Sequence, residues 1–277
     1  MPKPLIAAAF LLASGFCAVQ PAAADAVPEA GAVQGGTYEN PYFGLALRLP
    51  AGWSEGLPGP PPSLSGYYVL ASLHAATQGQ GDVLIAAQDL FFGDKTFGDA
   101  AGMTEALAAS LRDIPDLHID RPASAVQIDG RAFQRLDYSA GGLYRAWLAT
   151  DLRCHVVLFN LTAADPAALT QAAALLDALA ITDPGAPVCR ANYAAAPTLL
   201  YQVDPPQIAP KGLRIPVRIV IDTHGAVRQV HALRATPAQR ADIEATLRQW
   251  QFQPYAPDGQ PIALETGLLI GDAPRAP

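Results

Sequence analysis

Histidine and carboxylate side chains supply much of the acid–base and metal-binding chemistry of proteins, and this chain carries few of them at useful spacing. No two histidines are spaced to share one face of a helix; the five are His74, His118, His155, His224 and His231. His224 and His231 flank a predicted hairpin and could approach one metal ion, but no carboxylate or cysteine stands near them at ligand spacing. We interpret them as a turn residue and an exposed strand residue, and we predict no metal site.

Asp89 and Asp94 bracket the pair Phe91-Phe92, and two carboxylates can act as acid and base. Because they stand in a loop before a predicted helix, we interpret them as caps. No lipase-type serine elbow, zinc-protease helix, phosphate loop or dinucleotide-binding glycine turn occurs in the chain. The sequence therefore predicts a non-enzymatic protein without a cofactor, with an unrecognised hydrolase as the remaining alternative.

Three cysteines are present, and Cys17 lies in a segment that resembles a secretion signal. The other two, Cys154 and Cys189, do not form a Cys-x-x-Cys motif, which argues against redox catalysis. In an oxidising compartment, two cysteines favour one disulfide, worth about 3 to 4 kcal/mol on the chain-entropy model. Two buried free thiols are the alternative. The disulfide would fix the inter-domain linker to the first domain.

Composition limits the partners. The chain has 277 residues, of which 51% are hydrophobic and 16% charged, and this is typical of a folded globular protein of one large domain or two ordinary ones. A formal net charge of -7 with only 18 basic residues argues against a nucleic-acid surface. We predict no nucleic-acid partner.

The first 26 residues combine a basic start at Lys3, an apolar run and the small residues Ala22-Ala23-Ala24. This pattern predicts a cleaved secretory signal and a periplasmic or secreted protein without stable membrane insertion. An inner-membrane anchor through residues 4–20 is the alternative, although the run is shorter than a membrane span requires. Residues 27–37 are small and rich in glycine, and we expect a flexible tether.

Residues 38–182 are predicted to form an α+β domain, an antiparallel sheet with packed helices. Alternating apolar residues predict strands over 67–74, 82–90, 124–128, 130–138, 143–148 and 155–161, and helical periodicity predicts helices over 99–113 and from Asp165 to about 179. Gly56 to Gly66 carries four prolines and is predicted to be a surface loop.

The opening of this domain runs Tyr38-Glu39-Asn40-Pro41-Tyr42-Phe43-Gly44-Leu45 and then Leu49-Pro50-Ala51-Gly52-Trp53. These residues resemble the first hairpin of PsbP-like domains. The resemblance implies a binding or scaffolding fold whose members share little chemistry.

A linker rich in proline, glycine and alanine is expected over 183–197, followed by a second domain over 198–271 and a disordered tail over 272–277. Ile215 to Asp222 alternates apolar residues with Arg214 and Arg218 on the opposite face, which predicts a half-buried strand. A His224-Gly225 turn, a returning strand, a helix capped at Thr236 and a final strand near Ile262 to Ile270 complete the module.

This order, with Trp250-Gln251-Phe252-Gln253-Pro254 after the helix, resembles the C-terminal domain of the TonB family over residues 198 to 270. The resemblance implies three antiparallel strands, one main helix and a partner-binding module that does no chemistry. We predict a core that contains Ile219, Ile243, Leu247, Trp250 and Phe252.

Two functions are compatible with these patterns. In the first, the protein is an envelope adaptor whose C-terminal edge strand, marked by Leu264, Thr266 and Leu268, accepts a strand from an envelope protein. In the second, the first domain binds a small ligand or assists assembly of a complex through the loop from Gly56 to Gly66, with the C-terminal module as an accessory.

Overall fold

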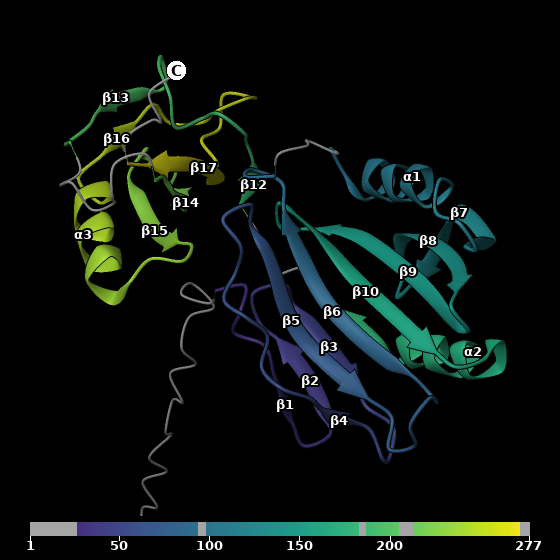
Figure 1. Cartoon of the computed structure of the whole chain (residues 1–277). Helices are drawn as coiled ribbons and strands as arrows, with labels where there is room; N and C mark the ends of the chain where they lie inside the picture. The colour runs from purple at the N-terminus through teal and green to yellow at the C-terminus, as the bar shows by residue number, and fades with distance from the viewer. Residues whose placement is uncertain (1–26, 94–97, 183–186, 205–212, 272–277) are drawn as a thin grey trace, which may run out of the picture.

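The computed structural model describes residues 27–93, 98–182, 187–204 and 213–271. The predicted signal, the alternative anchor, the predicted tail and Asp94 lie outside these residues. Among the described residues, no helix has the length and apolar character needed to cross a membrane. The fold is α+β, with several antiparallel sheets and three α-helices in the described part (Figure 1).

The N-terminal segment forms part of a sheet, so the expected tether over 27–37 is corrected. Gly35 and Gly36 have positive φ angles and make a tight turn between two short strands. Tyr38 is fully buried there, and the Asn40 side chain donates a hydrogen bond to the Pro28 carbonyl. The four-stranded sheet has the order β1-β2-β3-β11, with β1 Ala32–Gln34, β2 Thr37–Asn40, β3 Leu45–Arg48 and β11 Leu179–Ile181.

A seven-stranded antiparallel sheet forms the body of the first domain, in the order β4-β5-β6-β10-β9-β8-β7. One core cluster joins its inner face to the four-stranded sheet, through side chains such as Leu73, Ile85 and Phe159. The strands are β4 Ser54–Glu55, β5 Tyr67–His74, β6 Asp82–Asp89, β7 His118–Ile128, β8 Arg131–Ala140, β9 Leu143–Leu152 and β10 His155–Ala163.

Two helices pack against this sheet. The helix α1 (Ala100–Leu111) begins where the Asp99 side chain accepts a hydrogen bond from Gly102 N, and Met103 and Leu111 are buried. The helix α2 (Pro166–Ala174) begins after Asp165, which accepts from Ala168 N, and continues into the 3-10 helix η2 (Leu175–Ala178). Both starts follow the capping signals in the sequence.

The C-terminal module consists of a four-stranded sheet with α3 on one face (Figure 1). The expected three strands are joined by a fourth, β12, which pairs in parallel with β17, so the predicted linker contains a strand. A separate two-stranded sheet joins β13 to β16. The elements are β12 Val188–Cys189, β13 Leu199–Tyr201, β14 Ile215–Ile221, β15 Val227–Ala232, α3 Pro237–Leu247, β16 Gln251–Phe252 and β17 Leu264–Ile270.

The order of this sheet, β12-β17-β14-β15, corrects the expectation of a free β17 edge for the first two residues of the strand. Leu264 pairs with Val188 and is fully buried, and Thr266 is also buried. The physical reason is the disulfide at Cys189, which keeps the segment after the first domain beside the start of β17. The outer side of β17 is therefore covered at Leu264 and Glu265.

Candidate functional site

The second face of the C-terminal sheet packs on the first domain. In β14, the isoleucine and valine side chains at 215, 217, 219 and 221 face the core under α3, so Arg218 points the other way. Its register partners are Gly267 on β17 and His231 on β15, which share that face. Phe91 and Phe92 of the first domain lie against Gly267, where an added Cβ would stand 2.6 Å from the Phe91 Cβ.

Arg218 is the centre of a buried ionic cluster and is only 2% exposed, which corrects its predicted place on an exposed face. Its Nη1 donates to Asp89 of the first domain, and its Nε donates to Glu265 Oε1 at 3.1 Å. The guanidinium also lies 4.8 Å from the centre of the Phe91 ring. Although burial by itself lowers the pKa of Arg218, the charges of Asp89 and Glu265 raise it well above the usual range. Arg218 therefore stays charged.

Glu265 receives further donors from the first domain. The Tyr42 hydroxyl donates to its Oε1 at 3.1 Å, and Arg153 Nε lies 3.7 Å from its Oε2. The Arg153 guanidinium stacks 3.8 Å above the Tyr42 ring. Burial raises the pKa of Tyr42, so this hydroxyl stays protonated and able to donate.

Asp89 and His155 form the part of the cluster that belongs to the first domain. Asp89 accepts from Phe91 N at 2.7 Å, and His155 Nε2 lies 3.7 Å from its Oδ2. Burial raises the pKa of Asp89 although Arg218 opposes the shift. Burial, followed by the charge of Arg218, holds the pKa of His155 well below its usual range. The His155 ring is therefore neutral, and its Nδ1–H donates to the Arg153 carbonyl at 2.7 Å.

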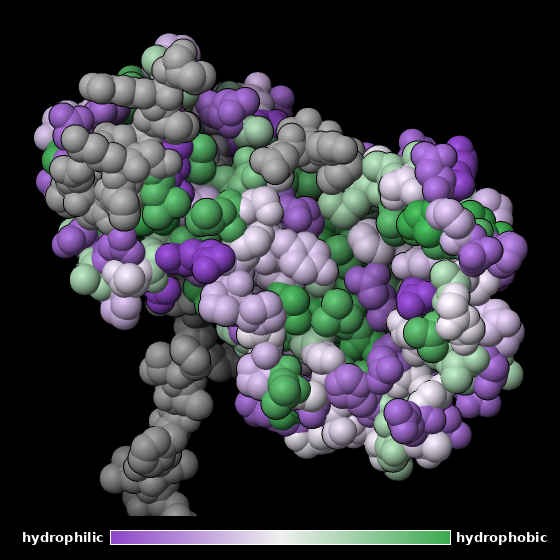
Figure 2. Space-filling view, viewed as in Figure 1, coloured by the Kyte–Doolittle hydropathy of each residue, from purple (hydrophilic) through white to green (hydrophobic). Residues whose placement is uncertain are grey.

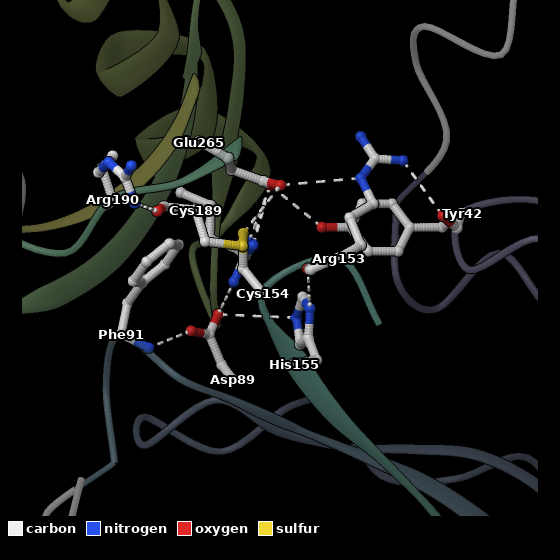
Figure 3. The surroundings of a disulfide bond; sticks show 10 residues. Tyr42, Asp89, Phe91, Arg153, Cys154, His155, Cys189, Arg190 and Glu265 are labelled. Atoms are coloured by element: carbon white, nitrogen blue, oxygen red, sulfur yellow. Dashed lines mark hydrogen bonds and ion pairs between the residues drawn. A yellow bond between two sulfur atoms is a disulfide. The ribbon is translucent and has the colours of Figure 1, made fainter. Parts of the chain in front are cut away.

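The predicted disulfide between Cys154 and Cys189 crosses the same region, with a Cα–Cα distance of 5.5 Å. Figure 3 shows Tyr42, Asp89, Arg153, His155 and Glu265 converging around it. Arg153 and Cys154 occupy the turn between β9 and β10 with positive φ angles of 45° and 61°. Covalent and ionic contacts thus join the two domains at one place.

A cavity of about 210 Å³ borders this interface, and Tyr42, Arg218, His231 and Glu265 are among its lining residues. Other lining groups already have partners: His231 Nε2 lies 3.5 Å from Glu29 Oε2, and Arg248 Nη2 pairs with Glu244 Oε1 at 2.7 Å.

A groove of about 600 Å³ lies beside β17. The carbonyls of Ala263 and Glu265 accept hydrogen bonds from β12. In a strand, the backbone N–H and C=O of every second residue point to the same side. The backbone groups of Gly267 and Leu269 therefore point to this outer side as well. In the described ranges, no strand pairs with that side of β17 beyond Glu265. The groove is lined by Phe91, Phe92, Gly93, Asn192, Ala194, Ala195, Leu199, Gln202, Arg214, Trp250, Gly267, Leu268, Leu269 and Gly271.

The other predicted residues fall at several places. The five predicted core residues lie in one buried cluster, and Trp250 donates its indole N–H to the Val203 carbonyl at 2.9 Å. His224 occupies the β14–β15 turn, and among the described residues no three ligating side chains gather to hold a metal ion. In the loop of 56–66, an added Cβ at Gly59 would stand 2.7 Å from Val69, so the loop packs closely on β5 there.

Sequence reasoning missed the cluster of Arg218, Glu265, Tyr42 and Arg153. A usable signal was present, because Arg218 and Glu265 interrupt two apolar strands that the register brings together. Asp89 was predicted as a cap, and it does accept from a backbone N–H, but its main partner is 129 residues away in the chain.

No family model matches the chain, and no curated protein matches it. Among solved structures, the cyanobacterial PsbP protein CyanoP from Synechocystis is 16% identical, with a TM-score of 0.40 over 55% of this chain and 99% of its own. LpqN of Mycobacterium tuberculosis, described as involved in cell envelope biogenesis, is 17% identical, with a TM-score of 0.35 over 50% of this chain and 83% of its own. PA94 from Pseudomonas aeruginosa, described as a protein of unknown function and putative regulator, is 20% identical, with a TM-score of 0.28 over 46% of this chain and 81% of its own. These similarities are distant and carry no argument about function.

Proposed function

We propose that this chain is a non-enzymatic docking protein of the bacterial envelope that binds an extended segment of an envelope protein along β17. The observation that supports the proposal is the groove beside the open part of that strand. Strand addition uses backbone hydrogen bonds for affinity and side-chain pockets for selectivity, and Gly267 and Leu269 offer the backbone groups. The partner strand is shorter than first expected, since β12 covers the start of β17.

The groove offers both apolar and polar contacts. Phe91, Phe92 and Leu268 line it, and Leu269 is 46% exposed at its border. Arg214 also lines it, and its buried Nε has no hydrogen-bond partner within the described part of the chain. An occupant with alternate apolar side chains and an acceptor opposite Arg214 would satisfy both features.

The order of β14, β15, α3 and β17 supports the finer proposal of a TonB C-terminal-like module. The hydrophobic face of that sheet is closed by α3, and the aromatic residues that follow the helix, Trp250 and Phe252, are buried. We propose an envelope location on the signal-like sequence of residues 1–26 and on the disulfide, which persists in oxidising compartments.

A second candidate function concerns the first domain, which would bind an apolar ligand or assist complex assembly. In the face shown in Figure 2, hydrophobic side chains gather over β5, β6 and β10. Val69 and Leu84 are among the half-buried residues of these strands. Binding of a hydrophobic dye that is lost when Val69 and Leu84 are replaced by serine would favour this candidate.

Site-specific photo-crosslinking tests the docking function. A photo-crosslinking amino acid at Gln202, on the rim of the groove, should capture one extended segment of an envelope protein. Leu269→Pro removes an outward N–H without touching the pairing to β14, and should abolish that crosslink. Leu269→Ala keeps the donor and should retain it. A crosslink unaffected by Leu269→Pro would contradict strand addition.

A further inference from the structure

The strand β12 occupies the position that a partner strand would take at the start of β17. Its Val188 N–H donates to the Ala263 carbonyl at 3.2 Å, and Arg190 N–H donates to the Glu265 carbonyl at 3.0 Å. A parallel strand of two residues has little stability of its own, since each backbone hydrogen bond contributes a small net amount. Another contact must therefore keep β12 in place.

The disulfide is the strongest such contact. Cys189 is the last residue of β12, and its partner Cys154 belongs to the β9–β10 turn of the first domain, 35 residues away in the chain. At this end, Val188 also packs half-buried against the core of the module, and Arg190 donates from its Nε to the Tyr255 hydroxyl at an exposed position. An exposed hydrogen bond of this kind is weaker than a covalent link.

We propose that β12 is a redox-controlled cover of the β17 edge: the Cys154–Cys189 disulfide holds it there, and reduction of the disulfide releases it. Its consequence for partner binding rests on the docking function proposed above. Release would extend the accepting edge from Gly267 back to Ala263, because the backbone groups of Ala263 and Glu265 would lose their partners.

The reductant is a dithiol of the thioredoxin type. Cys189 is exposed and Cys154 is buried, so the attacking thiolate reaches the Cys189 sulfur, and Cys154 leaves as a thiolate that takes up a proton. The second thiol of the reductant then attacks the mixed disulfide and frees Cys189 as a thiol. Two electrons pass to the protein, and the reductant becomes a disulfide.

Amide hydrogen exchange on the purified full chain tests the cover without any partner. After reduction, the amides of Val188 and Arg190 should lose nearly all their protection and exchange at least about tenfold faster than in the oxidised protein. Those of Ile219 and Val220 in β14 should stay protected, with only the decrease that the lower stability of the whole protein imposes. Unchanged exchange at Val188 and Arg190 would overturn the proposal. Equal residual protection of β12 and β14 after reduction would also overturn it, because the disulfide would then act only through the stability of the whole protein.

A proline variant separates the cover from the disulfide. Val188→Pro removes the donor to Ala263 while both cysteines remain. In the oxidised variant, the Glu265 amide, which faces β12, should exchange as fast as in the reduced wild-type protein. Reduction of the variant should not increase the exchange rate of this amide further. A further increase on reduction would show that the edge is protected by something other than β12.

Photo-crosslinking from Gln202 connects the cover to the docking function. The Cys154→Ser/Cys189→Ser variant should give a several-fold higher yield of the same crosslinked segment than the oxidised protein. An equal or lower yield would contradict a covering role. No crosslink from either protein would reject the docking function, and the exchange measurements would still decide whether β12 is released.

Discussion

Arg218 binds two buried carboxylates at once, Asp89 from the first domain and Glu265 from its own sheet. Taking three charged groups out of water is costly, and the cluster is stable only while the charges compensate one another. Arg218→Met fills the same space but leaves both carboxylates without their cation. We expect a loss of about 3 to 5 kcal/mol in the free energy of unfolding, measured by urea denaturation.

A matched control is Arg228→Met. Arg228 pairs with Asp222, but its side chain is 66% exposed, so water replaces the lost partner. The expected loss is below about 1 kcal/mol. Equal losses in the two variants would contradict the assigned role of Arg218.

His155 gives the stability a dependence on pH. Its pKa in the folded protein lies well below the usual range because the ring is buried, so the unfolded chain binds the proton more readily. Above about pH 6.5, His155 is neutral in both states and does not change the free energy of unfolding with pH. Below about pH 6.5, the free energy of unfolding decreases as the pH falls, by at most about 1.4 kcal/mol per pH unit. Asp89 acts in the opposite direction, since its raised pKa favours protonation in the folded state.

The difference between wild type and His155→Gln isolates the histidine. Urea denaturation between pH 7 and pH 5 should show a flatter dependence in this variant, because the titrating ring is gone while a donor for the Arg153 carbonyl remains. His118→Gln, at an exposed position of β7, should leave the dependence as in wild type. Parallel curves for wild type and His155→Gln would contradict this assignment.

At the scale of elements, the turn between β14 and β15 depends on a glycine. Gly225 has a φ of +82°, and an added Cβ would stand 1.9 Å from the Phe252 carbonyl oxygen, which belongs to β16. Gly225→Ala therefore adds a clash with the backbone to the cost of a left-handed conformation. We expect thermal denaturation to show a loss of more than about 2 kcal/mol.

Gly130→Ala is the matched control, because Gly130 has a similar φ of +70° and nothing stands within 4 Å of its added Cβ. This variant should lose about 1 kcal/mol, the cost of the left-handed conformation by itself. If the two variants lose equal stability, the contact with β16 does not matter.

Local patterns predicted the elements of both domains well where one face is apolar. The strand over 67–74 and the helix starts at Asp165 and Thr236 follow from neighbouring residues, and the structure has them. Local patterns failed for β1, because its stability comes from Tyr38 packing, and for β12, because a covalent bond to Cys154 places it. They also failed to predict the burial of Arg218, because its partner Asp89 is distant in the sequence and belongs to the first domain.

At the scale of the whole molecule, the disulfide contributes to stability by restricting the unfolded chain. Cys154→Ser/Cys189→Ser should lower the free energy of unfolding by about 3 to 4 kcal/mol on the chain-entropy model. Urea denaturation of the variant, beside the oxidised wild-type protein, measures the loss. Reduced wild type should match the variant, and a large difference between them would point to an effect of the serines themselves.

The ionic cluster and the disulfide together should make the two domains unfold as one unit. The three tryptophans allow a direct test, since Trp53 and Trp147 belong to the first domain and Trp250 to the C-terminal module. In Trp250→Phe, fluorescence follows the first domain alone, whereas circular dichroism follows both. In the oxidised protein we expect the two transitions to coincide. Adding Arg218→Met and reducing the disulfide should separate them, because the interface loses its central cation and its covalent link. Separate transitions already in the oxidised Trp250→Phe protein would mean that the interface does not couple the domains.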